Sequence, residues 1–113
     1  MERPVQIVFR HMDPSEALAR EARERAASLA DHDGHLANIH LSIDALRPHH
    51  HKGNAFRVVV TLRVSFRDAI VAVRENADAY AALREAMAAA RSQLDGKAPR
   101  RRDTIRAVPN PRA

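Results

Sequence analysis

The residues best suited to chemistry in this sequence are arginines and one lysine that could hold phosphate groups. They follow one another along a predicted C-terminal helix and the segment after it: Arg84, Arg91, Lys97, Arg100, Arg101 and Arg102. Few acidic residues oppose this basic series beyond Glu85 and Asp95. A guanidinium group binds phosphate through two parallel hydrogen bonds, so the series favours a nucleic-acid backbone as its ligand. No aromatic residue is interleaved with it, so contacts to shape and backbone, rather than base stacking, would carry recognition.

Other arginines have a simpler structural use. On a predicted N-terminal helix, Glu16 with Arg20 and Glu21 with Arg25 have the i,i+4 spacing of helical ion pairs. A second group shares the outer face of a predicted sheet: Arg57, Arg63 and Arg67. For this group, a solvated face with cross-strand pairs and a binding role are both open.

Three consecutive histidines, His49, His50 and His51, precede Lys52 and Gly53 in a predicted turn. Imidazoles ligate zinc, nickel or copper, but neighbours in a turn or strand point in alternate directions, and no carboxylate or thiolate completes a tetrahedral set. We therefore expect no metal here. The favoured interpretation is a cationic turn that contacts phosphate, more strongly charged below about pH 6.5, and a solvated turn is the alternative.

Nothing in the sequence predicts catalysis. No serine has the G-x-S-x-G setting of a nucleophile elbow, and three isolated glycines provide no phosphate-binding or dinucleotide loop. The chain has no cysteine, which excludes disulfides, thiolate metal sites and cysteine nucleophiles. We expect a protein that is not an enzyme, with no cofactor and no small-molecule substrate.

The charge of the chain is concentrated at its end. Its 113 residues predict one domain with a net charge of +5. Six of the 19 basic residues but one of the 14 acidic residues lie in residues 97–113, which leaves 13 of each in residues 1–96. No apolar run approaches the roughly 20 residues that cross a bilayer, so we expect a cytoplasmic protein without a membrane partner.

The hydrophobic pattern predicts four strands and two helices. Alternating apolar residues predict strands over 5–10, 39–46, 56–67 and 71–74, and in the long third strand Phe56 to Phe66 would form one apolar face. Asp13, Pro14 and Glu16 carry helix start signals, and that helix would run to about Asp31. Tyr80, Leu83, Met87, Ala90 and Leu94 recur at helical spacing after a cap at Asn76 or Asp78.

This order, β-α-β-β-β-α, predicts an α+β fold: a two-layer sandwich with a four-stranded sheet and two helices packed on one face. The domain would span residues 1–97. Residues 98–113 are rich in arginine and proline and poor in apolar side chains, so we expect a basic, disordered tail.

Three stretches carry a resemblance to a known family. The opening from Val5 to Leu18, the turn from His49 to Asn54, and Asp78 to Leu83, together with the element order, resemble the short form of the ribosome hibernation promoting factor family, also labelled sigma factor modulation proteins. The resemblance covers about residues 4–95. It implies binding to the small ribosomal subunit and its RNA in the decoding channel, which silences idle ribosomes in stationary phase or stress.

The resemblance also implies site residues. In the family, basic residues of both helices and of the chain end contact ribosomal RNA phosphates, which points to Arg84, Arg91 and Lys97, with Arg23 and Arg25 as weaker candidates. The sequence departs from the pattern at Ala88, Ala89 and Ala90, where members commonly have a lysine or arginine.

Three hypotheses follow from these observations. The first is a ribosome-associated translation inhibitor of the hibernation type, acting as a monomer or weak homodimer. The second is a diverged regulatory module of the same fold that binds a protein instead of the ribosome. The third, metal sensing through the histidine turn, requires metal uptake that His50→Ala abolishes.

Overall fold

The computed structural model of the protein describes residues 5–46 and 55–96. Six elements follow one another in the predicted order: β1 (Val5–Arg10), α1 (Glu16–His32), β2 (Leu36–Ala45), β3 (Phe56–Val64), β4 (Ile70–Asn76) and α2 (Ala79–Leu94). The four strands form one sheet in the order β1-β2-β3-β4. β1 is parallel to β2, and the other neighbours are antiparallel.

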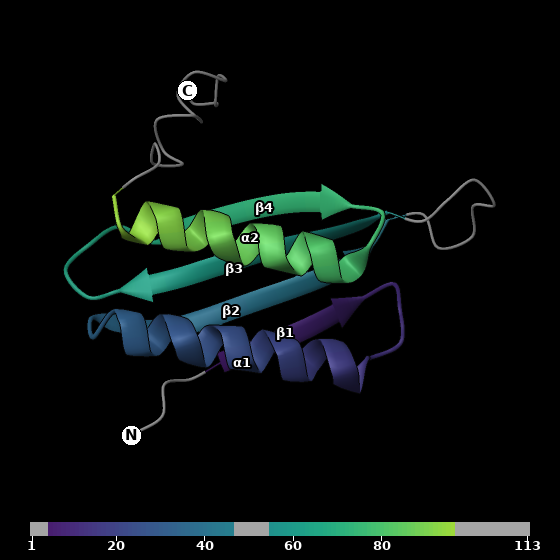
Figure 1. The fold of residues 1–113 in the computed structure, drawn as a ribbon, viewed down its shortest axis with the longest axis horizontal. Coiled ribbons are helices and arrows are strands. Elements are labelled where there is room, and N and C mark those ends of the chain that lie inside the picture. The colour runs from purple at the N-terminus through teal and green to yellow at the C-terminus, as the bar shows by residue number, and fades with distance from the viewer. Residues whose placement is uncertain (1–4, 47–54, 97–113) are drawn as a thin grey trace, which may run out of the picture.

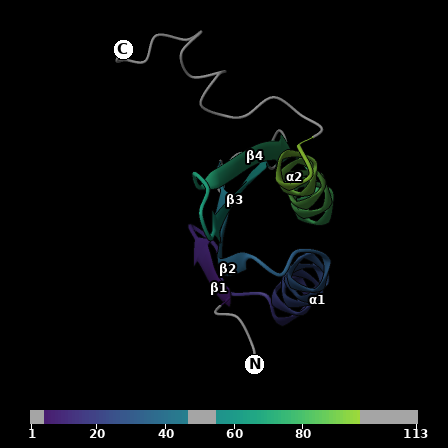
Figure 2. The same cartoon turned by 90° about the vertical axis from the view of Figure 1, so that its left-hand side faces the viewer.

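Both helices cover the same face of the sheet (Figures 1 and 2). They run in the same direction and end on the same side of the molecule, at the left of Figure 1. The predicted two-layer α+β sandwich, with its other face uncovered, is confirmed. Neither helix of the described chain has the length and apolarity that a membrane crossing would require.

The core lies between the helices and the covered face of the sheet. Side chains from alternate positions of β2 and β3 are fully buried, among them Ile39, Leu41, Val58 and Leu62. The helices contribute one buried stripe each, which for α1 comprises Leu18, Ala22, Ala26 and Leu29. α2 contributes Ala79, Ala82, Leu83, Ala86, Met87, Ala90 and Leu94. Because four of the seven in α2 are alanines, this helix can approach the sheet closely.

Capping residues fix where the helices begin. The Ser15 hydroxyl accepts a hydrogen bond from the Leu18 amide at 3.2 Å, so the cap of α1 is Ser15 and not Asp13. The Asp78 carboxylate accepts from the Tyr80 amide at 3.0 Å, which confirms one of the two caps predicted for α2.

The third strand is shorter than predicted. β3 ends at Val64, and the chain then turns through Phe66, whose φ of 67° lies in the left-handed region. Phe66 is therefore not on the apolar face of the strand, and 96% of its surface is exposed. Arg67 does not share the outer sheet face either. Its guanidinium donates to the Leu94 carbonyl at 3.1 Å, at the end of α2.

On the outer sheet face, Arg57 has the kind of cross-strand partner that is expected of a solvated face. Arg57 and Glu75 are register partners on β3 and β4, and their Nη2 and Oε2 atoms lie 2.9 Å apart. At the end of β2, Asp44 Oδ1 lies 2.8 Å from His11 Nδ1. These are the cross-strand and edge contacts expected of a solvated face.

Candidate nucleic-acid interface

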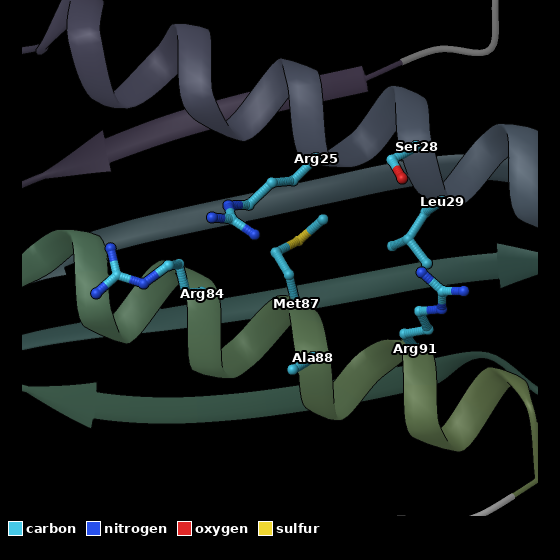
Figure 3. A pocket seen from close by; sticks show the side chains of 7 residues that line it. All are labelled: Arg25, Ser28, Leu29, Arg84, Met87, Ala88 and Arg91. Carbon is cyan, nitrogen blue, oxygen red and sulfur yellow. The ribbon is translucent and has the colours of Figure 1, made fainter.

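The two helices meet along a groove that opens on the side away from the sheet. α1 lines it with Arg25, Ser28 and Leu29, and α2 lines it with Arg84, Met87, Ala88 and Arg91. Its volume is about 220 Å³. The buried side chains of Leu29 and Met87 form its apolar base, and the arginines surround it (Figure 3). We call this feature the interhelical groove.

Helical periodicity explains which side chains reach the groove. In α2, the buried seam runs through Leu83, Met87 and Ala90, and residues next to that seam emerge at the edge facing α1. Arg84, Ala88 and Arg91 follow at steps of four and three residues, so they share one edge of the helix. In α1, Arg25 precedes the buried Ala26 and faces α2 in the same way (Figure 3).

Arg25 is held by its own helix. Its Nε donates to Glu21 Oε2 at 3.0 Å, and its Nη2 lies 2.9 Å from the same oxygen. The predicted i,i+4 pair of Glu21 with Arg25 is therefore confirmed. No ion pair joins Glu16 to Arg20 in the part of the chain that the structure describes. The pair with Glu21 orients Arg25, while the guanidinium remains at the groove.

Arg91 takes part in a cluster where the two helices end. His32 Nε2 lies 2.5 Å from Asp95 Oδ1, and Arg91 Nη2 lies 3.3 Å from His32 Nδ1. Because a guanidinium only donates, Nδ1 of His32 accepts, and Nε2 donates its hydrogen to Asp95. Arg91 Nε is 3.9 Å from Asp95 Oδ2, and 52% of the Arg91 side chain is exposed. The cluster joins the ends of both helices and leaves part of Arg91 open to solvent.

The groove therefore combines three guanidinium groups with no carboxylate among its lining residues. Guanidinium forks match the oxygens of a phosphate group. The three guanidinium groups lie along both helices beside an apolar base of Leu29 and Met87, so the arrangement suits anionic groups of a polymer lying across the helices.

The structure brings together three of the predicted site residues: Arg25, Arg84 and Arg91. Arg23 is exposed on α1 but does not line the groove, because two residues turn the helix by about 200°. Other predicted residues lie outside the described chain: Lys97, Arg100, Arg101, Arg102, His49, His50, His51 and Lys52.

No group of three or more metal-ligating side chains occurs within residues 5–46 and 55–96. The histidine turn that prompted the metal hypothesis is outside these ranges.

Sequence reasoning missed the cluster of His32, Arg91 and Asp95. The direction of the strands does indicate that the two helix ends meet. β1 and β4 point the same way in a β-α-β-β-β-α sheet of this order, so the helices that follow them also run the same way. His32 and Asp95, each at the end of a helix, are then expected at the same end of the molecule.

The two-layer β-α-β-β-β-α sandwich, with arginines along the groove between its helices, places the protein in the α+β class. The family model described as Sigma 54 modulation protein / S30EA ribosomal protein matches residues 5–102, and the chain belongs to this family. The family predicted from the sequence is thereby confirmed.

Two solved structures are similar to this one. A ribosomal subunit interface protein from Coxiella burnetii has a TM-score of 0.70 and 18% identity, with 82% of this chain and 94% of that chain covered. The N-terminal domain of Thermus thermophilus Protein Y has a TM-score of 0.69 and 14% identity, with 82% and 96% covered. At these identities the likeness concerns the fold. A comparison with curated proteins returns no match.

Proposed function

We propose that the protein is a ribosome-associated translation inhibitor that binds small-subunit ribosomal RNA in the decoding channel during stationary phase or stress. The observation that carries the proposal is the interhelical groove, in which Arg25, Arg84 and Arg91 converge without a lining carboxylate. The chain belongs to a family whose description includes a ribosomal protein, and this supports the ribosome as the partner. So does the fold shared with a protein named for the ribosomal subunit interface.

The proposed mechanism is occupancy and involves no chemical step. The arginines of the groove bind phosphates of the RNA backbone, and the rigid sandwich behind them fills space that mRNA and tRNA need. Further phosphate contacts are assigned to Lys97, to Arg100, Arg101 and Arg102, and to the turn of His49, His50, His51 and Lys52. The protein acts in the cytoplasm as a monomer or weak homodimer and needs no cofactor.

The charge distribution favours RNA over a protein partner. A protein-binding module of this fold would present an interspersed mosaic of charges on its helix layer. The groove instead has one sign of charge among its lining residues. Nearby carboxylates are engaged: Glu21 by Arg25, and Asp95 by His32.

Sedimentation tests this function directly. The full chain is mixed with purified small ribosomal subunits at low salt and centrifuged through a sucrose gradient. We expect it to migrate with the subunits and to return to the top of the gradient at high salt. Protein that stays at the top at low salt contradicts the proposal.

A further inference from the structure

Phe66 is the most unusual side chain outside the core. Among the described residues, the only large hydrophobic side chains that are exposed are Val5, at 36%, and Phe66, at 96%. Phe66 also has a φ of 67°, a left-handed conformation that bulky residues rarely adopt. Glycine or asparagine would fit this turn at lower conformational cost. The fold therefore gains little from a phenylalanine here, which points to a role outside folding.

The turn that carries Phe66 is anchored on both sides. The Ser65 amide donates to the His35 carbonyl at 2.9 Å. On the other side, Arg67 donates through Nη1 to the Leu94 carbonyl at 3.1 Å and through Nη2 to the Gln93 carbonyl at 3.5 Å. These bonds tie the β3–β4 turn to the start of β2 and to the end of α2. An exposed ring on an anchored turn is preorganised for a ligand, because little motion is lost on binding.

Among the residues that the structure describes, His35 supplies the one ring beside Phe66. Their centroids are 6.2 Å apart with an interplanar angle of 73°, an edge-to-face arrangement. The His35 side chain is itself 70% exposed, and its backbone amide is fixed by Asp33 Oδ1 at 2.8 Å. An edge-to-face pair leaves ring surface uncovered, so the two rings form a small aromatic corner, which we call the Phe66 corner.

The surroundings of the Phe66 corner favour a nucleobase over a protein as its ligand. Protein hot spots are aromatic side chains within a packed patch whose rim excludes water. The residues around Phe66 in the turn, Ser65, Arg67, Asp68 and Ala69, are all exposed and mostly polar. Two exposed rings without an apolar rim offer little to a protein pocket, but they offer what base stacking requires, an open π surface.

The position of the corner agrees with an RNA ligand. Arg67 binds the carbonyls of the last turn of α2, one turn beyond Arg91. The end of α2 thus lies on the side of the molecule where the β3–β4 turn lies, at the left of Figure 1. A strand whose phosphates bind Arg84 and then Arg91 continues towards this end.

We infer that the Phe66 corner is a stacking site for an unpaired base of RNA, with Phe66 as the platform and His35 at its edge. The inference rests on the proposed function, because it takes the RNA bound by the groove as its ligand. It adds base contacts to a surface that otherwise contacts only phosphate, and it predicts a preference for single-stranded over paired segments.

Tryptophan at position 66 makes the test direct, since the chain contains no tryptophan. The Phe66→Trp variant is titrated at low salt with a single-stranded oligoribonucleotide of mixed sequence, with the same sequence as a duplex, and with small ribosomal subunits. Stacking predicts quenching of the tryptophan emission by the single strand and by the subunits, and weaker quenching by the duplex. Ser65→Trp, on the neighbouring exposed residue, is the control and should respond less.

Affinity measurements complete the test. Phe66→Ala should weaken binding of the single strand by about 5- to 150-fold, the range of single base-stacking contacts of about 1–3 kcal/mol. Phe66→Leu should weaken it similarly, because leucine is apolar but has no π face. Both variants should unfold at about the wild-type temperature, since 96% of the Phe66 surface is exposed and little buried surface is removed.

The outcomes separate this inference from the proposed function. Full binding by Phe66→Leu, or a blue-shifted and brighter Phe66→Trp emission with subunits, overturns stacking in favour of a protein pocket. If Phe66→Ala binds subunits like the wild type while Arg84→Gln binds weakly, the stacking site is refuted and the proposed function stands. If Phe66→Trp is quenched by oligoribonucleotide while subunits are not bound, the stacking site stands and the proposed function falls.

Discussion

The sharpest prediction concerns the salt dependence of binding when two groove arginines lose their charge. Arg84→Gln and Arg91→Gln are combined, because both residues line the groove and neither is the sole ion-pair partner of a carboxylate. Asp95, which lies near Arg91, also contacts His32. Arg25 is left in place, since its removal would leave Glu21 as an uncompensated charge beside the RNA. Glutamine keeps much of the side chain and its hydrogen-bonding capacity while it removes the cation.

The magnitude follows from counterion release. Each phosphate neutralised contributes about 0.7 to 0.9 to the slope of log affinity against log salt concentration, so losing two contacts lowers the slope by about 1.4 to 1.8. Over a fourfold rise in salt, from about 50 to 200 mM, the wild type should lose roughly 7- to 12-fold more affinity than the double variant. Fluorescence anisotropy of labelled protein with small subunits, at four salt concentrations, measures both slopes.

A matched control separates the groove from net charge. Arg10→Gln combined with Arg63→Gln removes the same charge from exposed positions that alternate with core-facing residues of β1 and β3, on the uncovered sheet face. Its slope should equal that of the wild type. The assignment of the groove is refuted if the groove variant keeps the wild-type slope, or if the control flattens the slope equally.

Three further predictions concern neighbouring positions. Ala88→Lys adds a cation to the groove and should steepen the salt slope by about 0.7 to 0.9, which the same titration measures. Asp95→Asn removes the negative charge beside Arg91 and leaves His32 a weaker amide acceptor, so subunit binding should tighten while Tm falls by a few degrees; weaker binding would contradict this. Arg67→Ala removes hydrogen bonds to the Leu94 and Gln93 carbonyls and should cost about 1 kcal/mol, a Tm decrease of about 4–8 °C; an unchanged Tm would show that this cap is dispensable.

The fold was predictable because each element carries its own local signal. Apolar residues alternate in the strands and recur at helical spacing in both helices, and Asp78 precedes α2 as a capping residue. The error at the end of β3 has a physical reason. The alternation continues through Phe66, but Phe66 has a φ of 67° and the Arg67 amide donates to the Val64 carbonyl at 3.3 Å, so the chain reverses there. Residues 64–67 contain no glycine, proline or asparagine, so none of these turn residues indicates the reversal in the sequence.

The candidate site was predictable in part. Arg84 and Arg91 were expected to bind phosphate, and the sequence indicates that they share α2, but their approach to Arg25 depends on how the two helices pack. The contact between His32 and Asp95 joins residues 63 positions apart, which spacing along the chain does not indicate. The roles of Lys97, Arg100, Arg101 and Arg102, and of the histidine turn, stay predictions, as does the disorder of residues 98–113.

Net charge proved a poor guide to the surface of this domain. Residues 1–96 contain equal numbers of basic and acidic side chains, which indicated a neutral body. The fold places arginines, and no carboxylate, in the lining of the groove. Several carboxylates are engaged by nearby groups: Glu21 by Arg25, Asp44 by His11, Glu75 by Arg57, Glu85 by Asn76 and Asp95 by His32. None of them lines the groove, which therefore has a positive lining on a body whose charges balance.

This placement of charge has a consequence for binding. Exposed charges more than about 10 Å apart are largely screened at about 0.1 M salt, so acids far from the groove act only weakly on a phosphate placed there. Glu21 and Asp95, which lie beside Arg25 and Arg91, are close enough to reduce the positive potential of the groove. A balanced body also has little attraction for polyanions away from the groove. Specific binding at the groove can therefore coexist with weak non-specific binding, whereas a uniformly basic domain of the same size would bind any exposed RNA.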